Sequence, residues 1–241
     1  VLLDAVVIAL GSRVLDVASG TGVVARAAAR RAGGQGRVVA SDVSGPMLAC
    51  SAAVPAPDGA APLEYHQAPA EALPFGDDCF DVVLCQQGLQ FFPARAAAVR
   101  EMRRVLRPGG VAGIAVWAQG HLLEPFGVYG DELAATGVEP PFPKAFESET
   151  FTMDLDTVRS LFEEAGFSSV RASVLELPVS WPDAATAAAG VFGTPFGPLV
   201  HALSPDQRSR FDAALEKRFA PEEPGTPVRR QTAAVVVRAT A

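Results

Sequence analysis

The residue types with the clearest chemical potential lie in the segment VLDVASGTGVVA, residues 14–25. The segment is typical of a buried strand carrying Asp16, a tight turn through Gly20 and Gly22, and then a helix. Glycines remove side chains where a ligand must touch the backbone, and they accept turn dihedrals that other residues avoid. The N-terminus of the following helix directs free N–H groups at whatever sits above the turn. The segment therefore predicts the first β-turn-α unit of a nucleotide-binding sheet.

A second acidic residue, Asp42, follows twenty residues after Gly22, at the end of a strand expected over 37–41. A carboxylate at that place accepts both hydroxyls of a ribose, and capping of the next helix is its alternative role. Gly20, Gly22 and Ala25 also fit the dinucleotide pattern G-x-G-x-x-A. The glycine turn and Asp42 therefore predict a nucleoside ligand without deciding which one.

Asp16 discriminates between the possible nucleosides. A dinucleotide would bring its pyrophosphate to this turn, where the Asp16 carboxylate would repel it. A ligand with an ammonium and a sulfonium, and without phosphate, would be attracted. S-adenosylmethionine (SAM) is such a ligand.

VLDVASGTG resembles the first motif of class I SAM-dependent methyltransferases, V-L-D-x-G-x-G-x-G, with Ala18 in place of the first glycine. Later segments resemble the family in the same order, namely APAEALPF, FDVVLC and the RPGG that is common in type 11 small-molecule methyltransferases. The resemblance covers residues 12–118. It implies an α/β fold with a Rossmann-like, doubly wound, seven-stranded sheet of order 3-2-1-4-5-7-6, in which the last strand is antiparallel.

The resemblance also implies which residues bind the cofactor. These are Asp16, Ala18, Ser19, Gly20 and Gly22 at the turn, Asp42, Val43, Met47, Ala70 and Glu71 around ribose and adenine, and Gln86 at the amino-acid part. Pro69 departs from the family, which often has an aspartate there that reaches the adenine amine. A proline supplies neither a side-chain acceptor nor an N–H.

Methyl transfer is an in-line displacement, so the protein mainly orients the reactants and excludes water. The candidates for substrate orientation or for a base are Gln87, Gln90 and His121, and the candidates for the acceptor pocket are Phe91, Phe92 and Trp117. Many relatives have a histidine at the position of Gln90, but an amide takes no proton at neutral pH. His121 follows the fifth strand and could face the methyl donor, with a solvated loop histidine as the alternative.

Periodicity and turn residues predict the remaining elements. Strands are expected over 63–67, 80–85, 111–117, 170–177 and 231–239, and helices over 1–10, 21–32, 93–107 and 155–165. Residues 1–241 then form one methyltransferase domain with its cofactor core at 12–118. The segments 119–153 and 181–220 are expected to form a helical and loop cap over the edge of the sheet where such folds bind ligands.

Composition excludes several classes of function. A net charge of -7 disfavours a nucleic-acid partner, and no apolar run reaches the roughly 20 residues of a membrane span. Three cysteines without paired spacing indicate reduced thiols in the cytoplasm and no metal site. The arginines 100, 103, 104 and 107 are interpreted as a solvated helix face.

The leading hypothesis is a monomeric or homodimeric methyltransferase that acts on O, N or C of a small hydrophobic metabolite and releases S-adenosylhomocysteine (SAH). One alternative is a protein that retains SAM while it catalyses a cyclisation or rearrangement, or only binds it. A less favoured alternative is an NAD(P)-dependent oxidoreductase, which Asp16, the later motifs and the lack of a Tyr-x-x-x-Lys pair oppose.

Overall fold

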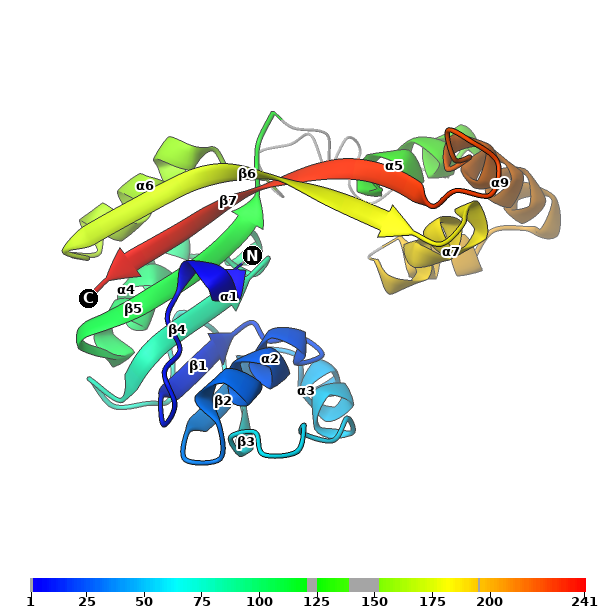
Figure 1. The fold of residues 1–241 in the computed structure, drawn as a ribbon. Helices are drawn as coiled ribbons and strands as arrows, with labels where there is room; N and C mark the ends of the chain where they lie inside the picture. Colours follow the sequence, from blue (N-terminus) through cyan, green and yellow to red (C-terminus); the bar gives the residue numbers. More distant parts are fainter. Residues whose placement is uncertain (1, 121–124, 139–151, 195) are drawn as a thin grey trace. The chain divides into compact units, whose positions relative to one another are not determined.

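In the computed structural model, which describes residues 2–120, 125–138, 152–194 and 196–241, seven strands form one sheet of order β3-β2-β1-β4-β5-β7-β6. The strands are β1 (Arg13–Val17), β2 (Arg37–Asp42), β3 (Leu63–Gln67), β4 (Phe80–Gln86), β5 (Leu106–Trp117), β6 (Ser169–Trp181) and β7 (Val228–Thr240). Strands β1 to β5 pair in parallel, and the arrow of β7 runs opposite to those of β5 and β6 (Figure 1). The predicted sheet order and antiparallel last strand are confirmed.

Helices cover both faces of this sheet, as a doubly wound fold requires. The helices α1 (Leu2–Ala5) and α2 (Val23–Ala32) lie in front of the strands in Figure 1, and α4 (Arg95–Val105) lies behind them. Because both faces are covered, the central strands are apolar without alternation, and Val83 and Leu84 of β4 are fully buried. The other helical elements are α3 (Gly45–Ala52), η1 (Leu89–Phe91), α5 (Phe126–Ala135), α6 (Leu155–Glu164), α7 (Ala184–Ala189), η2 (Gly190–Gly193), α8 (Gly197–His201) and α9 (Pro205–Arg218).

The helix predicted over residues 1–10 is wrong beyond Ala5, because only one turn buries apolar surface. Val6 is 3% exposed and packs over Gly113 of β5, where an added Cβ would lie 2.6 Å from its Cγ1 atom. Val7 and Leu10 are 77% and 82% exposed, so a longer helix would gain little apolar burial there.

The RPGG segment, predicted to end the helix before the fifth strand, lies inside β5 as an irregularity. The register shifts from Phe80↔Leu106 to Val82↔Val111, so β5 advances by five residues where β4 advances by two. Gly109 has a φ of +76°, and the Arg107 guanidinium forms an ion pair of 2.6 Å with Asp81 of β4. The segment therefore continues the strand through a bulge.

The chain divides into two compact units. Unit 1 comprises Val1–Trp117, Met153–Val174 and Val235–Ala241, and unit 2 comprises Ala118–Thr152 and Leu175–Ala234. Unit 2 has its own apolar core, which includes the buried side chains of Tyr129, Phe196, Phe211 and Phe219. Almost all of the predicted cap segments belong to unit 2, and their covering role stays a prediction. Strands β6 and β7 pass through both units.

No helix among the described residues combines the length and the apolar character needed to cross a membrane.

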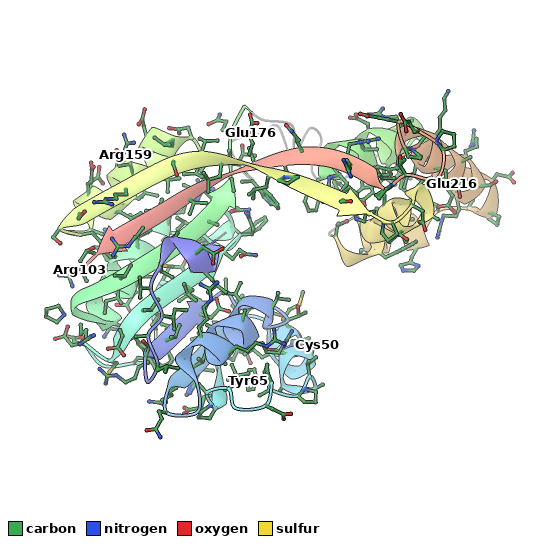
Figure 2. All side chains as sticks on the ribbon, in the orientation of Figure 1. Cys50, Tyr65, Arg103, Arg159, Glu176 and Glu216 are labelled. Atoms are coloured by element: carbon green, nitrogen blue, oxygen red, sulfur yellow. The ribbon has the colours of Figure 1, made fainter. Side chains whose placement is uncertain are left out.

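The cysteines are free, and Cys50 on α3 is exposed (Figure 2).

Candidate cofactor site

The turn between β1 and α2 has the backbone conformation that its sequence predicts. Ala18, Gly20 and Gly22 all have positive φ, at 55°, 54° and 77°. The Ser19 N–H donates to the carbonyl of Ser41 on β2 at 3.0 Å, and the Gly22 N–H donates back to Ser19 at 2.9 Å. The N-cap residue of α2 is Gly22, which has no side chain to cap the helix, and in the first turn the Ala25 N–H is directed at the Asp16 carboxyl group.

Asp42, at the end of β2, is fixed by this turn. Its Oδ2 atom accepts the Gly20 N–H at 2.8 Å, and its Oδ1 atom accepts the Ser44 N–H at 2.8 Å. Ser44, rather than Asp42, caps α3 by accepting the Met47 N–H at 3.4 Å, so the helix-capping alternative for Asp42 is not what the structure has. Each Asp42 oxygen keeps a second lone pair for a ligand hydroxyl.

A cavity of about 490 Å³ opens beside Asp42 within unit 1, a size in the range of small-molecule sites. Its lining residues are Ala18, Asp42, Val43, Ala68, Pro69, Ala70, Glu71, Gln87, Gly88, Phe91, Phe92 and Pro93. Only three of these have polar side chains, and two of the three are carboxylic acids. No Lys, Arg or His is among the described residues that line the cavity.

The structure brings eight of the predicted site residues together in this cavity, namely Ala18, Asp42, Val43, Ala70, Glu71, Gln87, Phe91 and Phe92. The others do not line it: Asp16, Ser19, Gly20, Gly22, Met47, Gln86, Gln90 and Trp117. His121 lies outside the described residues. The roles of these residues stay predictions.

Sequence reasoning missed four lining residues, Ala68, Pro69, Gly88 and Pro93. Pro69, Gly88 and Pro93 each adjoin a predicted site residue, and Pro69 was noted only as a departure from the family. Apolar residues and glycine have no polar or reactive side-chain group that marks them in a sequence, so only the fold shows that they line the cavity.

Asp16 lies buried in β1, just before the turn. It is 1% exposed, and its Oδ2 atom has no hydrogen-bond partner within the described ranges. Burial raises the pKa of Asp16 from its usual 3.8 to about 8, and the charge of Asp42 adds to the rise, while the backbone N–H of Ala25 opposes it. A cation beside this carboxyl group would favour its ionised form and so offset the rise. This environment and the two lining acids fit a positively charged nucleoside without phosphate.

Gly20 leaves space for such a ligand. A Cβ atom added there would meet nothing within 4 Å. The backbone N–H of the same residue is hydrogen-bonded to Asp42, so this open space lies beside the predicted ribose-binding residue. By contrast, a Cβ added at Gly22 would lie 1.9 Å from the Oγ atom of Ser51. The two glycines of the motif therefore serve different purposes, open space at the first and tight packing at the second.

The loop that carries Ala68 to Glu71 is attached to α4 by Arg104. The Arg104 guanidinium binds both carboxylate oxygens of Glu101, the Asp77 carboxylate and the carbonyls of Leu73 and Phe75. Glu101 in turn accepts the Leu73 N–H at 2.9 Å, and Arg104 lowers the pKa of Glu101. The interpretation of the four arginines as a solvated helix face is therefore wrong for Arg104, and also for Arg107, which lies on β5 and not on the helix.

The end of β4 is packed closely against the glycine turn. A Cβ added at Gly88 would lie 2.6 Å from the Cβ atom of Ala18 and 2.8 Å from the sulfur of Cys85. Gln87 has a φ of +57°, and its Oε1 atom accepts the Nε2–H of Gln90 at 3.2 Å. Backbone held in this region is costly for a residue other than glycine and often marks a functional site.

Over the described ranges, nowhere do three or more His, Cys, Asp or Glu side chains gather as a metal site would need.

Comparisons with known proteins agree with this geometry. A family model described as "Methyltransferase domain" matches residues 15–114. The ubiquinone/menaquinone biosynthesis C-methyltransferase of Yersinia enterocolitica is 35% identical over 177 residues, which are 68% of this chain and 70% of that protein. The chain belongs to the class I SAM-dependent methyltransferases.

Other relatives match a smaller part of the chain. An uncharacterized protein of Mycobacterium tuberculosis is 41% identical over 117 residues, which are 48% of this chain and 41% of that protein. The match thus spans about two fifths of that relative. Among solved structures, a candidate methyltransferase of Bacillus halodurans aligns with a TM-score of 0.63 at 21% identity, over 99% of this chain and 96% of that one. The [4+2]-cyclase SpnF aligns with a TM-score of 0.57 at 20% identity, over 99% and 78%.

The chain departs from its family's first motif at Ala18, and the structure explains why glycine is usual there. Ala18 has a φ of 55°, a conformation that costs an alanine roughly 1–2 kcal/mol. Its small side chain still fits because Gly88 opposite lacks a Cβ.

Proposed function

We propose that this methyltransferase binds SAM in the cavity beside Asp42 and transfers its methyl group to a small hydrophobic acceptor, releasing SAH. The observation that carries this proposal is the charge of the site. Two acids line the cavity, and no basic side chain is among the described lining residues. A cation at the turn would also ionise the buried Asp16 carboxyl group, whose pKa is about 8 in the ligand-free protein. A pyrophosphate would be repelled there, whereas a sulfonium and an ammonium would be attracted.

Several predicted residues that line the cavity have places consistent with their proposed roles. Asp42, oriented by two backbone N–H groups, would hold the ribose hydroxyls, and Val43 and Ala70 would pack against adenine. Bound SAM supplies an electrophilic methyl group on a sulfonium. The apolar wall that includes Phe91 and Phe92 would exclude water from that group.

The protein's contribution to the reaction is mainly orientation. Gln87 and Gln90 are amides, so neither takes a proton at neutral pH. These two residues would therefore orient the acceptor and not deprotonate it, and the atom that receives the methyl group would be C, O or N. The Yersinia relative is named a C-methyltransferase, which favours carbon. We place the protein in the cytoplasm, where free cysteines stay reduced, and we expect a monomer or homodimer.

Calorimetric titration tests the cofactor assignment. We expect SAM and SAH to bind, NAD⁺ and NADP⁺ not to bind, and Asp42→Ala to weaken SAH binding about 10-fold or more, because the ribose loses a charged acceptor. Asp58→Ala is the control, since Asp58 is an exposed acid of a loop outside the cavity lining. Tight dinucleotide binding without SAM binding would refute the proposal.

A second candidate is catalysis of a cyclisation with SAM retained. It is favoured by the likeness in fold to the [4+2]-cyclase SpnF and by the two amides at the end of β4. Release of SAH on turnover distinguishes the two, because a cyclase converts its substrate with no SAH formed.

A further inference from the structure

Gln87 differs from every other described residue that lines the cavity, because its side chain alone carries N–H donors. The remaining lining side chains are apolar, absent in glycine, or acids. Among the described lining residues, a ligand oxygen that needs a side-chain donor can therefore find one only in Gln87. SAM has such an oxygen in its carboxylate, and many methyl acceptors have one beside the reacting atom.

The backbone of Gln87 is fixed in an unusual conformation. Its φ is +57°, and its N–H donates to the carbonyl of Ala115 on β5 at 2.8 Å. Gly88 follows it with no space for a side chain, because an added Cβ would lie 2.6 Å from that of Ala18. Neighbouring strands and the glycine turn thus hold a non-glycine residue in the left-handed region at the edge of the cavity.

Gln90 fixes the side chain of Gln87. Gln90 is 1% exposed on η1, and its Nε2–H donates to the Oε1 atom of Gln87 at 3.2 Å. The backbone carbonyl of Gln90 accepts the Arg95 guanidinium at 2.7 Å, which fixes this residue to the start of α4. Because the oxygen of the Gln87 amide is thereby engaged, its NH₂ group remains for a ligand.

The buried amide of Gln90 is costly to keep. Its Oε1 atom has no hydrogen-bond partner in the part of the chain that the structure describes, and a buried acceptor without a partner is unfavourable. An apolar side chain would avoid that cost. Orientation of Gln87 explains why an amide occupies the position.

We propose that Gln87 is a specificity-determining residue whose NH₂ group hydrogen-bonds an anionic oxygen of a bound ligand, with Gln90 as its positioning residue. The inference rests on the proposed function, in which the ligands are SAM and a methyl acceptor. Two sources can supply the oxygen, the carboxylate of the cofactor or an oxygen of the acceptor.

Two pairs of probes distinguish these sources. SAH and 5′-methylthioadenosine share the nucleoside and the thioether, but only SAH has the carboxylate. 2-Naphthoate and 2-naphthylmethylamine share an apolar ring system and carry opposite charges. Calorimetry gives the affinity of each probe for the wild type, Gln87→Met and Gln87→Glu, and the naphthyl probes are measured with and without SAH.

If the cofactor supplies the oxygen, Gln87→Met weakens SAH binding about 10-fold and leaves the affinity for 5′-methylthioadenosine unchanged. If the acceptor supplies the oxygen, the same variant weakens 2-naphthoate binding to a similar extent and leaves the affinity for 2-naphthylmethylamine unchanged. In either case Gln87→Glu weakens binding of the affected anion further, because the new carboxylate at position 87 repels it. Gln35→Met is the control, since Gln35 is an exposed amide outside the cavity lining.

Gln90→Met tests the positioning role. We expect it to weaken the same probe as Gln87→Met, and the double variant to be no weaker than Gln87→Met alone, because both remove one interaction. The melting temperature should not fall, since the unpaired acceptor is removed with the amide. A merely structural role would instead lower the melting temperature and leave the affinities unchanged.

The inference is overturned if Gln87→Met changes the affinity for SAH and for 2-naphthoate no more than Gln35→Met does. It is also overturned if the wild type binds neither of these two probes. Failure of the proposed function is a separate result. It appears as a wild type that does not bind SAM or SAH, and the naphthoate measurement without SAH then still tests Gln87.

Discussion

At the scale of single residues, Asp16 ties the stability of the ligand-free protein to pH. Its pKa is raised from 3.8 to about 8 by burial, so between these values the folded protein holds a proton that the unfolded chain has lost. The stabilising effect is complete below about pH 4 and is lost as the pH rises through about 8. The free energy of unfolding should therefore fall with rising pH by up to about 1.4 kcal/mol per unit.

Urea unfolding between about pH 5.5 and about pH 7.5 measures this slope. Asp16→Asn should flatten it, because the amide does not ionise, and Asp58→Asn should not. Glu101 and Asp154 have lowered pKa values and titrate below this window, and burial raises the pKa of Cys85 to about 12, above it. Equal slopes in the wild type and Asp16→Asn would show that Asp16 is ionised in the folded protein.

The two glycines of the turn should respond differently to an added methyl group. Gly20→Ala meets open space, so we expect a loss of only about 1–2 kcal/mol from its positive φ, with SAH binding weakened about 10-fold or more. Gly22→Ala forces the Ser51 side chain to move and should cost about 2–4 kcal/mol in total. Urea unfolding and SAH titration measure both effects.

Gly59→Ala is the matched control, since Gly59 has a φ of +70° with nothing within 4 Å of an added Cβ and lies outside the cavity lining. It should lose stability as Gly20→Ala does and keep its SAH affinity. Equal SAH binding by Gly20→Ala and Gly59→Ala would show that no ligand approaches Gly20.

At the scale of elements, Arg104 couples α4 to the loop that lines the cavity. Arg104→Ala removes hydrogen bonds to two carboxylates and two carbonyls, so we expect a loss of about 1–3 kcal/mol and weaker SAH binding. Arg104→Lys should recover only part of the loss, because an ammonium cannot match the planar fork. Chemical denaturation and SAH titration measure both effects.

Arg100→Ala serves as the comparison for Arg104, because Arg100 is exposed on the same helix. It should change stability by less than about 0.5 kcal/mol. If Arg104→Ala behaves like Arg100→Ala, the loop is held by its apolar contacts alone.

At the scale of the whole molecule, β6 and β7 run through both compact units, so we expect the units to unfold together. SAH at about 100 times its Kd stabilises the folded state by about 2.7 kcal/mol. Scanning calorimetry should show one transition that SAH raises by about 5–10 °C and NAD⁺ leaves in place. Two transitions, of which SAH moves one, would show that the units unfold independently.

The sequence by itself determined the sheet, because local signals and apolar burial agree there. The strand at Leu63–Gln67 matches its predicted range, and Ser204 begins α9 through a capping box. The glycine turn and Asp42 were likewise recognisable, since each needs a particular residue type at a particular place.

Only the tertiary structure decided what depends on residues distant in sequence. The RPGG bulge follows from the register of β5 against β4. Arg104 attaches α4 to the cavity loop through the carbonyls of Phe75 and Leu73, which are 29 and 31 residues away in sequence. The cavity wall combines small and apolar side chains from the loops after β1, β2, β3 and β4, and the Gln87–Gln90 pair is recognised only because Gln90 is buried. Local patterns record what a residue prefers, whereas packing determines which partners it meets, and the cavity is formed by those partners.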